Sequence, residues 1–322
     1  MSTIKTILGP IFVDDQGKPD QPVALLWPSL FTDHRMWRHQ VRALHDYGWR
    51  TLATDPPGHG RSSGPGRPFT MDECAEAAIQ ILDATGNHAP VAYLGTSWGG
   101  FVAPRIALRA PKRISGMVLF NTSAERGTPF ERIRATALTK LMAISALDKR
   151  TARMIESGLL APETQRQQPE IGADLADHML AWDRRALITS VRSVLLDRDP
   201  VLDALAGVNV PTLVVSGKED RTLPSFHSQR MAQTLSDARH IEVSGAAHLV
   251  PLEAPNEANQ LILDFLRDLP RTDPQPDPGG SHERRTSSPD DHARQPARAH
   301  PTSPTPAHPP AHSRCRGPGL AQ

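Results

Sequence analysis

The sequence has few cysteines, no long apolar run and almost no excess of charge of either sign. Its two cysteines, Cys74 and Cys315, can form neither a disulfide framework nor a four-cysteine zinc site. No apolar stretch approaches the roughly 18 residues that a membrane helix needs, and the N-terminus lacks the pattern of a signal peptide. A formal net charge of +1 argues against a nucleic-acid surface or electrostatic membrane binding. We therefore expect a cytoplasmic protein that binds neither nucleic acid nor membrane.

Large apolar residues are almost missing from the end of the chain. Residues 270–322 contain one Leu and no Val, Ile, Phe, Tyr, Trp or Met, but 12 of the 31 prolines. Such a segment cannot bury enough apolar surface to offset the entropy lost on ordering. We predict a disordered tail rich in Pro, His and Arg, preceded by 269 residues that are long enough to bury a core.

Short apolar runs alternate with longer amphipathic segments over residues 1–124. This pattern predicts strands at Val23–Trp27, Trp49–Thr54, Val91–Leu94 and Ile114–Phe120. It also predicts helices at Arg35–Tyr47, 70–85 and Gly99–Arg109. Because strands and helices alternate, the strands should be parallel and joined by right-handed crossovers.

The alternation stops over residues 125–205, which contain no strand-like run. Helical patterns such as Phe130–Ile144 and Leu187–Leu196 replace it. The alternation returns over residues 206–269, with strands predicted at Thr212–Ser216 and His240–Val243 and helices at Ser225–Leu235 and Asn256–Leu269. We predict an α/β core in two parts, with a mostly parallel sheet flanked by helices. The inserted helical cap should cover the carboxyl edge of the sheet, where open α/β sheets bind ligands.

A Gly-x-Ser-x-Gly pattern stands where a predicted strand meets a predicted helix. Its members are Gly95, Ser97 and Gly99. A serine on such a turn has a strained backbone, and its neighbours must be small because strand and helix crowd together there. Its hydroxyl would lie at a helix N-terminus, where partial positive charge favours a developing anion. We predict that Ser97 is a nucleophile; the alternative is a tight turn with a structural serine.

A serine nucleophile needs a base and an acid that orients the base. For a serine on this kind of turn, the acid and then the histidine follow it along the chain. Asp220 lies after a predicted strand and is the predicted acid, with Glu219 as the alternative. His248 lies in a loop of small residues after the last predicted strand and is the predicted base. The competing histidines are His34 and His59.

Attack on a carbonyl also needs two N–H donors for the oxyanion. One predicted donor is the N–H of Trp98, the residue after the nucleophile. The second should come from the loop after Val23–Trp27. Leu30 is the first choice in this loop and Phe31 the second. Pro28 has no N–H and cannot serve as a donor.

With these motifs, residues 1–269 resemble the α/β-hydrolase family. Residues 55–63 (DPPGHGRSS) are similar to its Asp-x-x-Gly-x-Gly-x-Ser turn, and residues 248–255 to its His-x-x-x-x-Glu-x-Pro pattern. Residues 29–37 (SLFTDHRMW) and 246–249 (AAHL) are most similar to loops of 3-oxoadipate enol-lactonases. Four positions differ. Pro28-Ser29 replaces the His-Gly that most members of the family carry, while Phe31 replaces the Gly and Trp98 the usual Met of the enol-lactonases.

The resemblance implies a serine hydrolase that uses no cofactor and no metal. Its expected substrate is a small or medium ester or lactone, cleaved through an acyl-enzyme. Phe31, His34 and Trp182 are predicted to line an apolar pocket with Trp98, although plain packing is the alternative for Trp182. Carbon–carbon bond hydrolases and cofactor-free peroxidases of the same fold remain alternatives, as does a receptor that binds a ligand without turnover. The oligomeric state stays open, with a homo-oligomer among the options.

Overall fold

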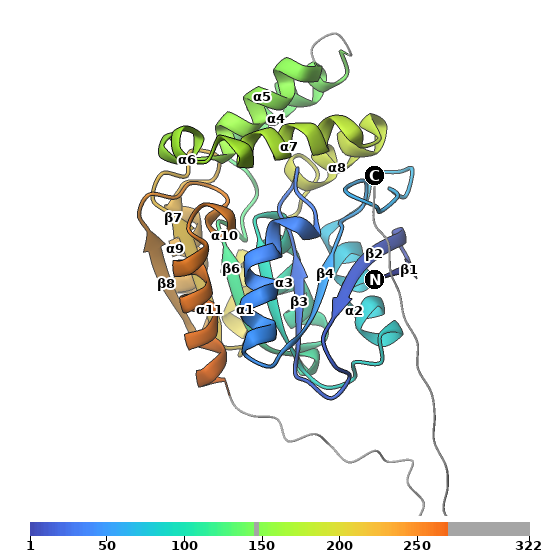
Figure 1. Ribbon diagram of the computed structural model, residues 1–322, viewed down its shortest axis with the longest axis vertical. Helices are drawn as coiled ribbons and strands as arrows, with labels where there is room; N and C mark the ends of the chain where they lie inside the picture. The colour runs from blue at the N-terminus through green and yellow to red at the C-terminus, as the bar shows by residue number, and fades with distance from the viewer. Residues whose placement is uncertain (145–147, 270–322) are drawn as a thin grey trace, which may run out of the picture. The chain divides into compact units, whose positions relative to one another are not determined.

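One eight-stranded sheet forms the centre of the computed structural model, which describes residues 1–144 and 148–269 (Figure 1). All described residues belong to one structural unit. The predicted tail, residues 270–322, lies outside the described residues. The strands are β1 (Ser2–Thr6), β2 (Gly9–Gln16), β3 (Val23–Trp27), β4 (Arg50–Thr54), β5 (Val91–Thr96), β6 (Ile114–Phe120), β7 (Thr212–Gly217) and β8 (Ala238–Val243).

The spatial order of the strands is β1-β2-β4-β3-β5-β6-β7-β8. The pairs β1–β2 and β2–β4 are antiparallel, and all other neighbouring pairs are parallel. The predicted mostly parallel sheet is therefore confirmed, whereas the antiparallel hairpin β1–β2 was not predicted. Every residue of the central strands β3, β5 and β7 is buried, because helices cover both faces of a parallel sheet.

Helices flank the sheet on both faces (Figure 1). On one face α1 (Arg38–Asp46) packs against α11 (Pro255–Asp268), and on the other α2 (Met71–Ala84) packs against α3 (Trp98–Arg109). Helix α9 (Ser225–Thr234) packs against β7 and β8. The shorter helical segments are η1 (His34–Trp37), η2 (Pro111–Arg113), η4 (Leu202–Gly207) and α10 (Val250–Glu253).

The start of α2 illustrates how local sequence sets these boundaries. The Thr70 hydroxyl accepts a hydrogen bond from the Glu73 N–H at 3.1 Å, and the Glu73 carboxylate accepts one from the Thr70 N–H at 2.9 Å. This reciprocal capping satisfies two backbone donors that a helix leaves unpaired. The helix then buries one face, which includes Cys74 and Ile81, against the core. The predicted helix start at residue 70 agrees with this cap.

Among the described residues, five α-helices follow β6 and precede η4 and β7 in the chain. They lie together above the carboxyl ends of the parallel strands (Figure 1). Their bounds are α4 (Pro129–Met142), α5 (Asp148–Leu159), α6 (Pro162–Gln167), α7 (Pro169–Ala181) and α8 (Arg184–Leu195). Since β6 and β7 are hydrogen-bonded neighbours, the helices form an insertion between two adjacent strands.

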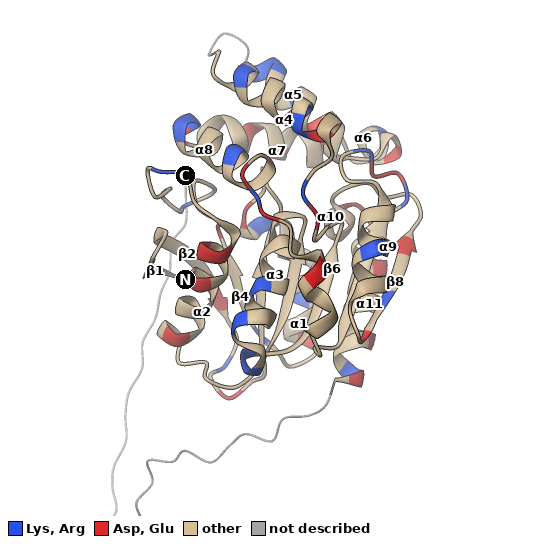
Figure 2. Ribbon diagram, turned by 180° about the vertical axis from the view of Figure 1, so that it is seen from behind, with Lys and Arg blue, Asp and Glu red and all other residues tan. Residues whose placement is uncertain are grey.

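Charged residues of both signs are interspersed over the core and the helical insertion (Figure 2). This distribution accords with the near-zero net charge of the whole sequence. Within residues 1–144 and 148–269, no helix combines the length and the apolar character needed to span a bilayer.

Candidate active site

Ser97 lies on the turn between β5 and α3, with φ 51° and ψ −101°. A positive φ is unusual for a residue with a side chain and marks a strained position. Two hydrogen bonds hold this backbone: the Ser97 N–H donates to the Phe120 carbonyl at 2.8 Å, and the Thr122 hydroxyl donates to the Ser97 carbonyl at 3.0 Å. The turn thereby carries the Ser97 side chain to the edge of the sheet and to the start of a helix.

The glycines on either side of Ser97 are required by close backbone approach. A Cβ on Gly95 would lie 2.6 Å from the carbonyl carbon of Gly99. A Cβ on Gly99 would lie 2.0 Å from the carbonyl oxygen of Trp27. Any larger residue at either position would push α3 away from β3 and β5. The Gly-x-Ser-x-Gly pattern thus follows from the packing of this turn.

Asp220 and His248 meet at the same edge of the sheet, although they come from different loops. The Oδ2 atom of Asp220 lies 2.7 Å from the Nδ1 atom of His248, and both side chains are buried. Asp220 Oδ1 accepts hydrogen bonds from the N–H groups of Thr222 and Leu223, at 2.8 and 2.9 Å. These bonds fix the carboxylate, which in turn fixes the orientation of the imidazole through Nδ1 and leaves Nε2 for another partner. The structure brings Asp220, and not Glu219, to His248.

The two predicted oxyanion donors have no hydrogen-bond partner among the described residues. Leu30 and Trp98 are buried, and the Trp98 N–H is free because it opens helix α3. The Phe31 N–H instead donates to Nε2 of His59 at 3.1 Å. Of the two candidates in this loop, Leu30 is therefore the one with an available N–H.

Four of the candidate residues line one cavity of about 390 Å³. Ser97, His248, Leu30 and Phe31 line it from the core. Its other walls come mainly from apolar side chains of the helical insertion, among them Leu138, Leu141, Ile155, Leu159 and Leu195. Among the described residues, none forms a hydrogen bond with the Ser97 hydroxyl. Hydrogen bonds between catalytic groups are often long before a substrate binds.

Residues 22–255 match the family model described as the alpha/beta hydrolase fold. The chain belongs to the α/β-hydrolase family. It is 26% identical over 258 residues to 3-oxoadipate enol-lactonase 2 of Acinetobacter baylyi, covering 78% of this chain and 91% of that protein. It is 25% identical over 304 residues to epoxide hydrolase A of Mycobacterium tuberculosis, covering 80% and 94%.

A solved structure gives the same result for the fold of this α/β hydrolase. The enol-lactonase from Burkholderia xenovorans LB400 superposes with a TM-score of 0.73 at 25% sequence identity, covering 80% of this chain and 97% of that one. The predicted α/β-hydrolase fold and the predicted hydrolase family are confirmed. The names of the relatives include hydrolases of different bonds, so family membership does not fix the bond that is cleaved.

Two residues to which the sequence analysis gave no role support the loop that carries His248 in this hydrolase. The Asn121 side chain donates to Oδ2 of Asp220 and to the Ala247 carbonyl, both at 2.9 Å. Glu253 accepts from the N–H groups of Ala247 and Leu249 at 3.0 Å. Burial raises the pKa of Glu253 despite these hydrogen bonds. The spacing of Glu253 after His248 was the one signal in the sequence that pointed to it.

Glu253 also connects this loop to the helical insertion. Its Oε2 accepts from the Ala161 N–H at 2.6 Å and from the Thr164 hydroxyl at 2.9 Å, and both residues lie at or in α6. A second link is the His248 N–H, which donates to the Leu159 carbonyl at 3.0 Å. The loop that carries His248 and the α5–α6 region are thus held together by the Glu253 carboxylate and one backbone hydrogen bond.

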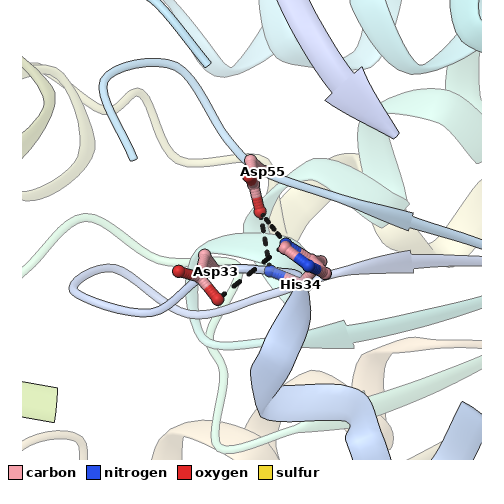
Figure 3. A group of neighbouring side chains, drawn as sticks. All are labelled: Asp33, His34 and Asp55. Carbon is pink, nitrogen blue, oxygen red and sulfur yellow. Dashed lines mark hydrogen bonds and ion pairs between the residues drawn. The ribbon is translucent and has the colours of Figure 1, made fainter. Parts of the chain in front are cut away.

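The structure does not bring His34 into the cavity of Ser97. His34 Nδ1 lies 2.6 Å from Oδ1 of Asp55 (Figure 3). The His34 side chain borders a separate cavity of about 800 Å³, which residues of α7 also line. The reason is local: Asp33 caps η1 and accepts from the Arg35 N–H, which directs the His34 side chain back toward β4. Burial lowers the pKa of His34, but the hydrogen bond and charge of Asp55 outweigh it, and the pKa is raised.

Asp33, His34 and Asp55 place three ligand-type atoms within 4.8 Å of one another (Figure 3). Each already has partners in the chain. Asp33 pairs with Arg35, and Asp55 accepts from the N–H groups of His34 and Arg61 as well as from the His34 ring. The cluster is therefore accounted for as an ion-pair network that holds the turn after β4.

Trp182 also lies outside the cavity of Ser97. It ends α7 and lines a small cavity inside the helical insertion with Met142, Ala152 and Leu187. Its ring packs against His59, with ring centroids 4.9 Å apart. Of the four predicted pocket residues, only Phe31 lies in the wall of the Ser97 cavity. Trp98 is fully buried in the core, and Trp182 packs the insertion against the core.

Proposed function

We propose that this chain is a serine hydrolase that cleaves a carboxylic ester or lactone through an acyl-enzyme on Ser97. The observation that carries the proposal is the 2.7 Å contact between Asp220 Oδ2 and His248 Nδ1, together with the cavity that His248 and Ser97 both line. The chain's own side chains supply a nucleophile, a base and an orienting acid in the order that this fold uses. The similarity to enol-lactonases supports a lactone or ester as substrate.

In this proposal His248 Nε2 takes the proton of the Ser97 hydroxyl as the Ser97 oxygen attacks the substrate carbonyl. Asp220 holds the imidazole with Nδ1 protonated and stabilises the imidazolium that forms. The tetrahedral intermediate breaks when the imidazolium gives its proton to the leaving oxygen. A water then attacks the acyl-enzyme with His248 as the base, which releases the acid and restores Ser97.

The N–H groups of Leu30 and Trp98 are the proposed oxyanion donors. Both are buried and free of other partners in the described chain, as an oxyanion hole requires. Each donor of this kind contributes about 3–4 kcal/mol to stabilising the transition state. The mostly aliphatic cavity walls would exclude water and suit a small or medium acyl group.

Labelling with a fluorophosphonate, followed by peptide mapping, tests the nucleophile. We expect the adduct on Ser97 and no adduct in the Ser97→Ala variant. That variant should lose at least about 10⁴-fold in turnover while keeping its fold, because one member of a triad carries most of the effect of the whole. Full activity of Ser97→Ala would overturn the proposal.

A substrate panel tests the bond that is cleaved. The panel contains 4-nitrophenyl esters, enol-lactones, vinylogous diketones and, for peroxidase activity, an acid with hydrogen peroxide. We expect turnover of an ester or a lactone that depends on Ser97. Turnover of the diketones alone would instead assign carbon–carbon bond hydrolysis. Tight binding without any turnover would assign a receptor.

A further inference from the structure

We propose that Phe31 selects the substrate, because its ring takes up space beside the reacting carbonyl and limits the bulk of the acyl group there. The inference deepens the proposed function and rests on it for the identity of the reacting bond. Its basis is a phenylalanine that lines the cavity of Ser97 in a backbone conformation suited to glycine. The class of substrate is thus an ester or lactone whose acyl group is unbranched at the carbon next to the carbonyl.

Phe31 occupies the third position of a tight turn. The Thr32 N–H donates to the Ser29 carbonyl at 3.2 Å, which closes a turn of four residues. Leu30 and Phe31 are its two central residues. Phe31 has φ 67°, and a turn with a positive φ at its second central residue favours glycine there. For a bulky side chain such a φ is an outlier that strains the backbone.

Several hydrogen bonds hold the turn in this conformation. The Phe31 N–H donates to Nε2 of His59 at 3.1 Å. The Thr32 hydroxyl donates to the Ser29 carbonyl at 2.8 Å, and the Ser29 N–H contacts the sulfur of Met36 at 3.4 Å. Strained conformations persist where the surrounding structure fixes them. None of these contacts uses the ring of Phe31, so a smaller residue can keep the turn.

The other strained residues of this kind belong to the candidate site. Among the described residues that are not glycine, three have a positive φ, and these are Phe31, Ser97 and Asn121. Ser97 is the proposed nucleophile, and Asn121 donates to the carboxylate of Asp220. Strained residues cluster at functional sites. Phe31 is the bulky member of the set and lines the same cavity as Ser97, so a function of its ring accounts for the strain.

The order of the strands places Phe31 on the acyl side of the reacting carbonyl. Ser97 follows β5, and Phe31 follows β3, the neighbour of β5 on one side. His248 follows β8, which lies beyond β6 and β7 on the other side. The leaving oxygen must face His248 to receive its proton, so the acyl group extends toward the loop after β3. Only 5% of Phe31 is exposed, so its side chain fills space that a branched acyl group would need.

Two esters that differ in one phenyl group test the inference. These are 4-nitrophenyl phenylacetate and 4-nitrophenyl diphenylacetate, in which the second phenyl group adds bulk at the carbon next to the carbonyl. After correction for spontaneous hydrolysis, we compare kcat/KM for the diphenylacetate with kcat/KM for the phenylacetate. Phe31→Gly should raise this ratio by at least about tenfold over wild type, since one methylene in an apolar pocket already changes kcat/KM by about 10- to 200-fold. An unchanged ratio in folded Phe31→Gly would overturn the inference.

A second variant separates the space left by the ring from the strain of the backbone. Phe31→Ala should raise the ratio as Phe31→Gly does, because both variants remove the ring. The two should differ in stability: Phe31→Gly should unfold at a higher urea concentration, because glycine adopts a positive φ without steric cost. A midpoint for Phe31→Gly that is no higher than that of Phe31→Ala would overturn the argument from strain.

Phe265→Ala is the matched control, because it removes a buried ring from α11 outside the cavity. It should leave the ratio at the wild-type value. A rise as large as that of Phe31→Gly would mean that any loss of core packing admits the bulky ester, and would overturn the assignment. If neither small variant at Phe31 folds, Phe31→Leu decides, because it also shortens the side chain and should raise the ratio.

The two product acids give a readout that needs no turnover. We expect titration calorimetry to show that Phe31→Gly favours diphenylacetate over phenylacetate at least about tenfold more than wild type does. That gain in a protein that cleaves neither ester would support the role of Phe31 and reject the proposed reaction. Cleavage of the phenylacetate ester, with no change in either ratio, would support the reaction and reject the role of Phe31.

Discussion

Nε2 of His59 accepts the N–H of Phe31 at 3.1 Å and so joins the turn after β4 to the loop that carries Leu30. The other ring nitrogen lies 3.0 Å from the Pro57 carbonyl, which makes Nδ1 the donor. Burial lowers the pKa of His59 to about 4, so the ring is neutral at pH 7 and can serve as this acceptor. Phe31 adopts φ 67°, and this hydrogen bond holds that strained position.

Replacement of His59 should therefore damage both stability and turnover. In His59→Ala the buried Phe31 N–H loses its acceptor, which costs about 1–3 kcal/mol of unfolding free energy. The loop that positions the Leu30 N–H is then released, and kcat should fall by about tenfold or more. Urea unfolding and steady-state kinetics measure the two effects. His88→Ala is the control, because His88 is exposed; equal unfolding free energies of His59→Ala and wild type would contradict the expectation.

Replacement of Ser97 by glycine should stabilise the fold while it removes the proposed nucleophile. Glycine adopts a positive φ without steric cost, whereas Ser97 has φ 51°. Backbone strain of this kind costs a residue with a Cβ about 1–3 kcal/mol, and the extra unfolded-state entropy of glycine offsets about 0.4–1 kcal/mol of it. We therefore expect Ser97→Gly to unfold with a free energy about 0.5–1 kcal/mol above that of Ser97→Ala, which keeps a Cβ at the same backbone. Urea denaturation of the two inactive variants makes the comparison. A less stable glycine variant would show that the backbone at this turn is relaxed.

Glu253 should matter more for stability than an ordinary carboxylate, because four hydrogen-bond donors converge on it. In Glu253→Gln the new NH₂ group faces donors instead of accepting from them. We expect a loss of about 2–4 kcal/mol in unfolding free energy, together with a lower kcat since the His248 loop is released. Glu257→Gln, at an exposed position of α11, is the control for loss of charge. Equal stabilities of the two variants would contradict this role.

His227 should make stability depend on pH. Burial lowers its pKa, but hydrogen bonds to Glu131 and Glu125 outweigh this effect, and the pKa is raised. The stabilising contribution is therefore complete below the unfolded pKa of about 6.5 and is lost as pH rises through the folded pKa. Besides the two carboxylates, Arg230 is the charged group at this site, paired with Glu125.

We expect the difference in unfolding free energy between wild type and His227→Gln to be larger at about pH 6 than at about pH 9. Arg230→Gln serves as the control, because it removes a partner of Glu125 that does not titrate in this range. A difference that is constant with pH would mean that His227 keeps one protonation state across the range.

The order of chemical groups along the chain was predictable, and the direction of individual side chains was not. Ser97, Asp220 and His248 each follow a strand of the parallel sheet, so a strand pattern suffices to bring them to one edge. His34 also follows a strand, β3, but the cap at Asp33 directs its side chain toward Asp55. That direction depends on one short helical turn, which residue periodicity does not encode.

Burial of charged residues was the second feature that the sequence did not reveal. Arg198 and Glu253 look like surface residues in a sequence, because charged side chains are rarely enclosed. Their burial results from contacts with residues far away in the chain: the Arg198 guanidinium lies over the ring of Phe101, and the Glu253 carboxylate accepts from the N–H of Ala161. The hairpin β1–β2 was missed for a different reason: β1 is short and mostly exposed, so its pattern resembles that of a loop.

Because β6 pairs with β7, the chain leaves the sheet after β6, forms the helical insertion and returns to the adjacent position in the sheet. The order of the strands therefore brings the proposed reacting groups to one edge of the sheet. The helical insertion supplies most of the remaining walls of the cavity that Ser97 and His248 line. The proposed reacting groups and most of the residues that would select a substrate thus belong to separate segments of the chain, the α/β core and the helical insertion. Replacing the helical insertion between Phe120 and Thr212 with another one should therefore change the substrates that are accepted and leave the positions of the proposed reacting groups unchanged.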